Sequence, residues 1–98
     1  MASNVLDMLQ KRVQTLADNV LRIESDIQHT QAQLQQQQAA LTRAEQAGNV
    51  AEVRLCLTLI QGLEMQLPNL DTRLNKLLQS QRLFARQLEQ HQAAAETV

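Results

Sequence analysis

Apolar residues recur along most of the chain at alternating steps of three and four residues. In the first half the series is Leu6, Leu9, Val13, Leu16, Val20, Ile23, Ile27, Thr30, Leu34, Gln37, Leu41 and Ala44. In the second half it is Val53, Cys56, Ile60, Leu63, Leu67, Leu70, Leu74 and Leu77. This spacing is typical of a helix that packs along one stripe against another helix. The pattern predicts two long helices, at about 3–46 and about 50–92.

The strongest break in the pattern is the segment EQAGNVAEV between the two stripes. Gly48 suits the left-handed position that ends a helix. Asn49, with Glu52 three residues later, has the spacing of a capping box at the start of the next helix. We therefore expect a turn at 47–49, and a turn this short places two helices side by side and antiparallel.

The two stripes also predict a register. If the turn is centred between residues 48 and 49, the numbers of facing residues add up to 97. Apolar residues then meet in most layers, as Val13 meets Phe84. Some layers are mixed, as where Gln37 meets Ile60, and such layers fix the register at a cost in stability.

Pro68 lies inside the second stripe, yet the apolar steps continue through it in phase. A proline removes the hydrogen bond to the carbonyl four residues earlier, here that of Glu64, and costs about 3 kcal/mol in a helix interior. A loop would have reset the phase. We therefore expect one continuous second helix that is kinked near Pro68.

The expected fold is all-α, an elongated antiparallel left-handed coiled-coil helical bundle in a single domain, 1–98. Ninety-eight residues suit one domain with a modest core. The sequence leaves open whether residues 83–98 continue the second helix or fold back as a third. We expect a third helix to be short or absent.

Several leucines lie outside the stripes, and near the turn they make the second helix apolar on nearly all sides. A helix of this kind is usually buried, so a second copy, a third segment or a foreign partner should cover it. The expected partner-binding residues are Leu55, Leu59, Gln66, Pro68, Asn69, Arg73, Lys76 and Leu83. The alternative is that this flank is a dimer seam whose two cations are merely solvated.

Composition narrows the class of protein. The net charge of −1 gives no electrostatic footprint for nucleic acid or for an anionic membrane. No apolar run approaches the ~20 residues of a membrane span. The single cysteine, Cys56, excludes an internal disulfide and fits a reducing compartment. We therefore expect a partner that is neither nucleic acid nor membrane.

Catalytic and metal-binding patterns are missing from the sequence. His29 and His91 stand far apart, without carboxylates or thiols at ligand spacing. Cys56 falls in a stripe and is expected to be a core residue. We expect no enzyme activity and no cofactor. The ending Glu96-Thr97-Val98 resembles a weak terminal-carboxylate recognition pattern, whose role the sequence leaves open.

The segment Leu67-Pro68-Asn69-Leu70-Asp71-Thr72-Arg73-Leu74 resembles the second helix of the tubulin-binding cofactor A family, which are tubulin-specific chaperones. The resemblance rests on an aliphatic–proline pair followed by a basic–aliphatic pair, on the glycine-bearing turn and on Arg22-Ile23-Glu24 in the first helix. The chain departs from the family in using Gln where family members use Lys. It also lacks a basic start to its second helix and ends before a full third helix.

The resemblance implies a cytoplasmic, cytoskeleton-associated chaperone that binds and holds β-tubulin before assembly of the α/β-tubulin heterodimer. The residues themselves give a broader expectation, a helical protein with an uncovered apolar flank and no catalytic site. The alternative function is a structural coiled-coil tether or a subunit of a larger helical assembly. A homodimer is a further expectation, because a lone helix pair has a marginal core.

Overall fold

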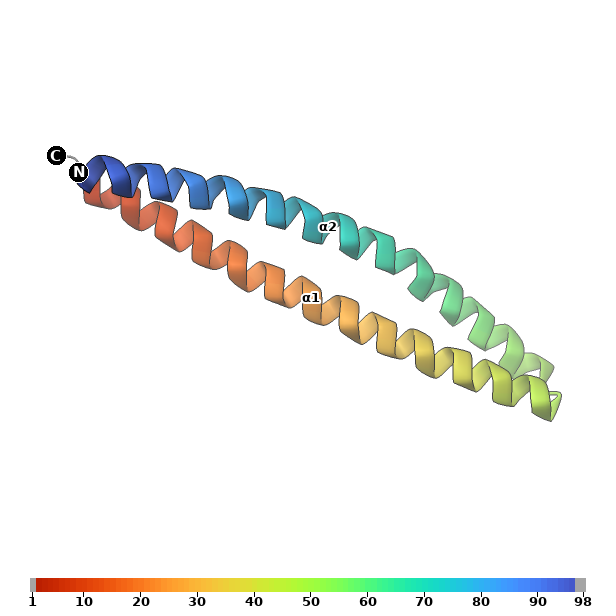
Figure 1. Ribbon diagram of the computed structural model, residues 1–98. Helices are drawn as coiled ribbons and strands as arrows, with labels where there is room; N and C mark the ends of the chain where they lie inside the picture. Colours follow the sequence, from red (N-terminus) through yellow and green to blue (C-terminus); the bar gives the residue numbers. More distant parts are fainter. Residues whose placement is uncertain (1, 97–98) are drawn as a thin grey trace. The chain divides into compact units, whose positions relative to one another are not determined.

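The computed structural model describes residues 2–96, which form two helices, α1 (Ala2–Ala47) and α2 (Val50–Glu96) (Figure 1). Two residues join them. Within 2–96 there is neither a strand nor a third helix. The second helix, α2, continues to Glu96 instead of ending near 92. The all-α helix-pair fold is thereby confirmed, whereas the handedness of the coiling stays a prediction. Thr97 and Val98 of the terminal recognition pattern lie outside the described residues.

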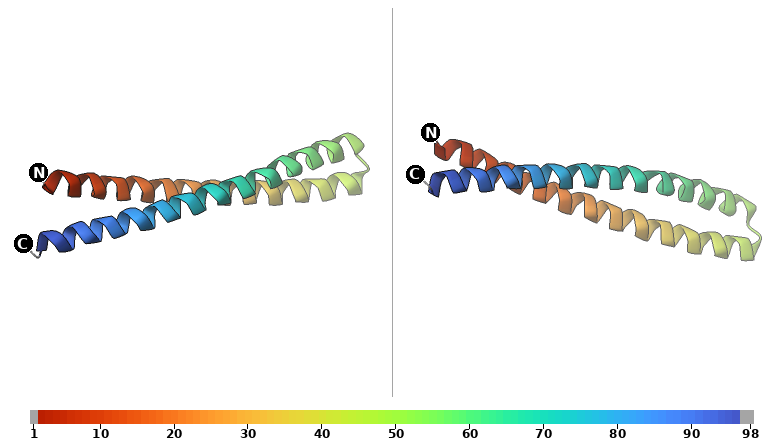
Figure 2. Two further views of the ribbon diagram at one scale, coloured as in Figure 1. Left: turned by 90° about the horizontal axis from the view of Figure 1, so that it is seen from above. Right: turned by 45° about the horizontal axis from the view of Figure 1, so that its top comes forward.

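Contacts divide the chain into two compact units. The terminal unit contains residues 1–23 and 73–98, and the turn unit contains residues 24–72. Each unit contains one segment of α1 and one segment of α2, and both helices are continuous in all views (Figures 1 and 2). The expectation of a single domain stays a prediction.

The turn between the helices is built by local hydrogen bonds. Gly48 has a φ of 67°, the left-handed conformation that glycine adopts without strain. Its N–H donates to the Glu45 carbonyl at 3.1 Å, and the Asn49 N–H donates to the Ala44 carbonyl at 3.0 Å. This pair of bonds is a Schellman motif, which satisfies carbonyls at the end of α1.

Asn49 then begins α2. Its side-chain Oδ1 accepts a hydrogen bond from the Glu52 N–H at 3.2 Å, and its carbonyl accepts one from Val53 at 3.0 Å. The Asn49 cap was predicted from sequence and is present. The capping box predicted with Glu52 is not completed, because the Asn49 N–H donates to the Ala44 carbonyl of α1 and not to the Glu52 carboxylate.

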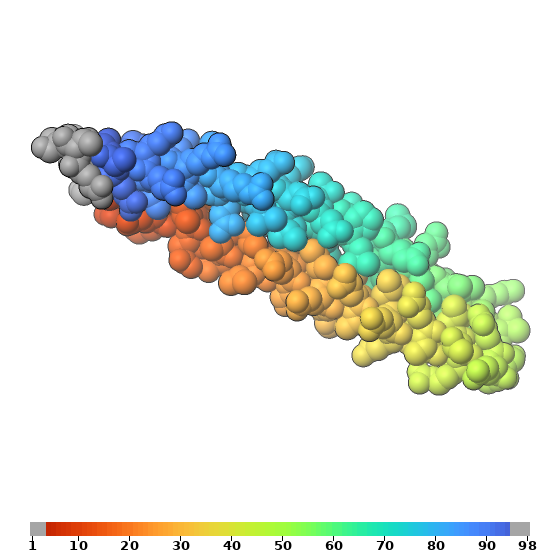
Figure 3. Space-filling view, viewed as in Figure 1, coloured from red at the N-terminus to blue at the C-terminus, as the bar shows by residue number. Residues whose placement is uncertain are grey.

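Both predicted stripes form the seams of the helix pair. Every residue of the two stripes is buried or half-buried, which confirms the apolar periodicity. Among the described residues the most buried side chains are Leu16, Val20, Thr30, Ala44, Cys56 and Ile60. Figure 3 shows side chains of α1 and α2 meeting along the turn unit, between its yellow and green parts.

Thr30 is the buried polar residue of the seam among the described residues, and only 5% of its surface is exposed. Its hydroxyl donates to the Asp26 carbonyl of the preceding turn at 2.8 Å. Burial of an unpaired hydroxyl costs about 1–3 kcal/mol, and this bond removes most of that cost. The seam therefore accepts a small polar residue without a partner on α2.

Pro68 lies inside α2, which continues through it without interruption. The ribbon of α2 curves within the turn unit, from green to cyan in Figure 1. A proline in a helix interior favours such curvature, because its ring crowds the preceding turn and one backbone bond is lost. The Thr72 hydroxyl donates to the Pro68 carbonyl at 2.9 Å, so the next turn has an added local bond.

Candidate protein-binding surface

The eight residues predicted to bind a partner are exposed in the structure. They belong to both units. The turn unit contains Leu55, Leu59, Gln66, Pro68 and Asn69, and the terminal unit contains Arg73, Lys76 and Leu83. Exposure is what a binding surface needs, yet whether these residues act together stays a prediction.

Three leucines close to the turn lie outside the apolar stripe of α2 and remain exposed. Leu55, Leu57 and Leu59 keep 58%, 50% and 43% of their surface exposed. They sit on the same two helical turns as the buried Cys56 and Ile60. This part of α2 is therefore apolar around most of its circumference, although α1 covers only one side of it.

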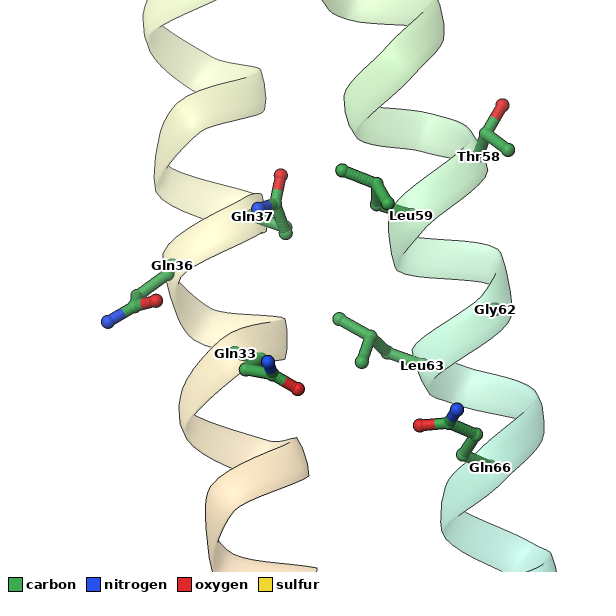
Figure 4. A pocket seen from close by; sticks show the side chains of 8 residues that line it. All are labelled: Gln33, Gln36, Gln37, Thr58, Leu59, Gly62, Leu63 and Gln66. Atoms are coloured by element: carbon green, nitrogen blue, oxygen red, sulfur yellow. The ribbon is translucent and has the colours of Figure 1, made fainter.

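A groove of about 300 Å³ runs between the helices within the turn unit. Its lining residues are Gln33, Gln36 and Gln37 of α1 and Thr58, Leu59, Gly62, Leu63 and Gln66 of α2 (Figure 4). Leu59 and Leu63 point toward α1, whereas Thr58 and Gln36 point away from the opposite helix. The groove thus has an apolar wall on α2 and an amide-rich wall on α1.

Gly62 gives the groove part of its depth. It lies in the middle of α2, where glycine costs about 1 kcal/mol relative to alanine. A Cβ added at this position would meet no atom within 4 Å, so packing inside the chain does not require glycine there. The absence of a side chain instead leaves room beside Leu59 for a side chain from outside.

This groove is uncharged. Its lining contains no charged residue and no histidine or cysteine. Leucine side chains provide apolar contact, and glutamine amides both donate and accept hydrogen bonds. Such a surface suits a helix that presents small apolar residues with neighbouring amides or hydroxyls.

A second groove lies within the terminal unit and has about 470 Å³. Its lining residues are Met8, Leu9, Lys11, Arg12, Thr15 and Phe84. The Arg12 guanidinium carbon lies 5.5 Å from the centre of the Phe84 ring, within the range of a cation–π contact. This groove is mainly apolar, and two cations border it.

The two units carry opposite charge, which the balance of the whole chain conceals. The terminal unit has seven Lys and Arg against four Asp and Glu, a net charge of +3. The turn unit has two Arg against six Asp and Glu, a net charge of −4. Counting charge separately for the residues near the turn and near the termini would have revealed this difference from sequence.

Sequence reasoning also missed the glutamine wall of the first groove and the whole of the second groove. The glutamine-rich stretch of α1 was expected to be a polar face only. The predicted register already placed Gln37 opposite Ile60, and this mixed layer lies beside the groove. The register therefore indicated a polar residue at this place. It did not indicate a groove, because the depth of a groove depends on the distance between the helices.

Other kinds of site have no support in the described part of the chain. Between residues 2 and 96, no three His, Cys, Asp or Glu side chains are grouped as ligands of a metal ion. In the same range neither helix has a segment long and apolar enough to cross a membrane. Cys56 is buried and has a free thiol.

No family model matches this chain, and no curated protein or solved structure matches it either. Function is therefore inferred from the helix pair and from its exposed surfaces.

Proposed function

We propose that the chain is a non-catalytic helical binding module whose turn unit binds an amphipathic helix of another protein. One observation carries this proposal. Gly62 opens a groove beside the exposed Leu59, although no neighbour in the chain requires a glycine. Gly62 lowers the stability of α2, and no contact inside the chain compensates for that loss. We therefore expect the compensating contact to form in a complex.

The form that these contacts favour is a structural one, a coiled-coil tether or a subunit of a larger helical assembly. An added helix would cover Leu55 and Leu59 and convert the helix pair into a three-helix arrangement. Burying a leucine contributes about 1.5–3 kcal/mol, so two leucines supply a substantial part of a micromolar affinity. The glutamines beside them would then fix the register of the added helix.

A β-tubulin chaperone is the second candidate. It is favoured by the Leu67-Pro68 pair and by Arg73, an exposed cation on the same helix. In this candidate function, charge would accelerate the encounter with an acidic client and the leucines would provide the desolvated contact. The location would then be cytoplasmic and cytoskeleton-associated.

Affinity capture with matched variants tests the module. The test variant is Leu55→Ser with Leu59→Ser, and the control is Met65→Ser, which replaces an apolar side chain that is 67% exposed outside the groove. We expect the double variant to lose the captured helical protein at least about tenfold, because two apolar contacts are removed. Equal capture by the double variant and the control would refute the proposed surface.

Purified α/β-tubulin and isolated β-tubulin then separate the two candidates. If the chaperone candidate is right, the wild-type chain retains β-tubulin and the variant Arg73→Glu with Lys76→Glu retains less, with a larger loss at low salt. Both side chains are exposed, so the free energy of unfolding of this variant should stay within about 0.5 kcal/mol of the wild-type value. A wild-type chain that retains no tubulin excludes the chaperone and leaves the tether.

A further inference from the structure

The opposite charges of the two units bear on contacts between copies of this chain. Terminal units, at +3 each, repel one another, and turn units, at −4 each, do the same. A terminal unit and a turn unit attract. Two copies can pair terminal unit with terminal unit, turn unit with turn unit, or terminal unit with turn unit. Electrostatics favours the third pairing.

Both units also expose apolar side chains and a groove. On the turn unit these are Leu55, Leu57 and Leu59 beside the groove at Gly62. On the terminal unit they are Met8, Leu21 and Leu83, with the groove beside Phe84. Charge complementarity thus coincides with surfaces that gain from leaving water.

The exposed area leaves room for such a contact. The chain exposes 7545 Å², whereas a compact monomer of 11.1 kDa exposes roughly 5,700 Å². A standard interface buries about 800 Å² on each partner. One copy can therefore contribute a full interface from the surface that its own helices leave uncovered.

We propose that a second copy of this chain is an occupant of these surfaces, with the terminal unit of one copy bound to the turn unit of the other. Leu83 of the terminal unit is apolar and 55% exposed, and a Cβ at Gly62 would meet no atom within 4 Å, so this side chain has room beside Gly62 of the other copy. Leu59 of the turn unit suits the apolar groove that Met8 and Phe84 line. This goes beyond the proposed foreign partner and does not depend on it.

The salt dependence of self-association gives the first test. Sedimentation equilibrium of the wild-type chain should show association that weakens at least about tenfold between 50 and 500 mM NaCl, because salt screens attraction between the units. Contacts between like units would strengthen with salt instead. A chain that stays monomeric at 100 μM in 50 mM NaCl, or associates more strongly in high salt, overturns the proposal.

Charge reversal identifies the units involved. Changing Lys76, Arg82 and Arg86 to Glu takes the terminal unit from +3 to −3, and changing Glu24, Glu45 and Glu64 to Lys takes the turn unit from −4 to +2. All six side chains are exposed. Each triple variant alone should lose association, and the chain with all six changes should regain it. Failure of the six-fold variant to associate, with helicity kept by circular dichroism, contradicts the pairing of opposite units.

Zero-length cross-linking of the unmodified chain locates the contact even if the variants misfold. Both lysines, Lys11 and Lys76, belong to the terminal unit, and six of the ten Asp and Glu residues belong to the turn unit. Carbodiimide coupling is carried out in a mixture of ¹⁴N and ¹⁵N copies. A bond that joins a ¹⁴N peptide to a ¹⁵N peptide must link two different copies. We expect these bonds to join the lysines to acids within 24–72. Bonds confined to Asp7, Asp18, Glu89 or Glu96, or no bonds between copies, refute the contact.

Discussion

In both the turn unit and the terminal unit α1 packs on α2 along an apolar seam, but the two units differ in how far burial extends beside that seam. In the terminal unit burial spreads beyond the seam. Six flanking residues there are half-buried, namely Ala17, Asn19, Leu78, Ser80, Ala85 and Gln87. In the turn unit the only flanking residue with this burial is Ala40, while three leucines beside the seam remain exposed.

The residues on the flanks of the seam differ between the two units. Three of the six half-buried flanking residues of the terminal unit are small, namely Ala17, Ser80 and Ala85. In the turn unit Gln33, Leu59 and Gln66 lie beside the seam, stay exposed and line the groove between the helices. A single heptad pattern can thus give two regions that differ in how far burial extends beyond the seam.

Matched truncations of the two seams should have the largest effect. Leu16→Ala in the terminal unit and Ile60→Ala in the turn unit each remove a buried aliphatic group, at a cost of about 2–4 kcal/mol. Urea unfolding followed by circular dichroism measures this loss. Hydrogen exchange would show whether each variant opens only its own unit, as two separate units require. Equal deprotection of both units by either variant would mean that they unfold as one.

Pro68→Ala should stabilise the turn unit by about 1–3 kcal/mol, because the new N–H can donate to the Glu64 carbonyl. The thermal midpoint should rise accordingly. Asn69→Ala serves as the control, since it changes only helix propensity at a neighbouring exposed position. A midpoint no higher than that of the control would show that α2 has already adjusted to the proline at no cost.

Asn49→Ala should destabilise the turn unit by about 1 kcal/mol, because Glu52 loses the side-chain acceptor for its N–H. Asn49→Asp retains an acceptor and should stay near wild type. Chemical denaturation of the three chains measures the difference. If alanine and aspartate behaved alike, the cap would not contribute to stability.

Gly62→Ala should stabilise α2 by about 0.5–1 kcal/mol, since the added methyl group meets no atom within 4 Å. The same methyl group partly fills the groove, so self-association or partner binding should weaken. This opposite movement of stability and binding is the signature of a glycine kept for an interface. A variant that gains stability and binds as well as wild type would remove Gly62 from the binding surface.

Arg12→Gln should have the smallest effect, a loss of about 0.5 kcal/mol in the terminal unit, because the contact with the Phe84 ring is lost at an exposed cation. Lys11→Gln removes the neighbouring cation, which does not lie over this ring, and should cost less. Thermal melts at low and high salt compare the pair. Equal losses would assign the effect to net charge instead of the ring.

Sequence alone predicted the helices, the seams and the turn, because each follows from local chemistry or from a period repeated many times. Gly48 and Asn49 illustrate the local part, since one backbone conformation and one side-chain acceptor decide the turn. The end of α2 was placed too early, because the alanine-rich tail retains helix propensity after the apolar stripe stops.

The grooves were beyond those rules, whereas the charge of the units required a separate count for each end of the predicted helix pair. The depth near Gly62 depends on how far apart the helices lie, which heptad positions do not determine. The +3 and −4 charges emerge only when residues distant in sequence, such as Arg12 and Arg86, are assigned to one unit. The identity of any partner depends on a second molecule and stays a prediction.

The Schellman turn has a consequence for the order of events during synthesis. The turn unit joins residues that leave the ribosome soon after one another, so its short loop can close within about a microsecond of their release. The contact between Arg12 and Phe84 must instead wait until Phe84 has been translated, several seconds after Arg12 at about 5–20 residues per second. The first turns of α1 therefore spend that interval with their apolar stripe not yet covered by α2. During it, their apolar side chains face solvent.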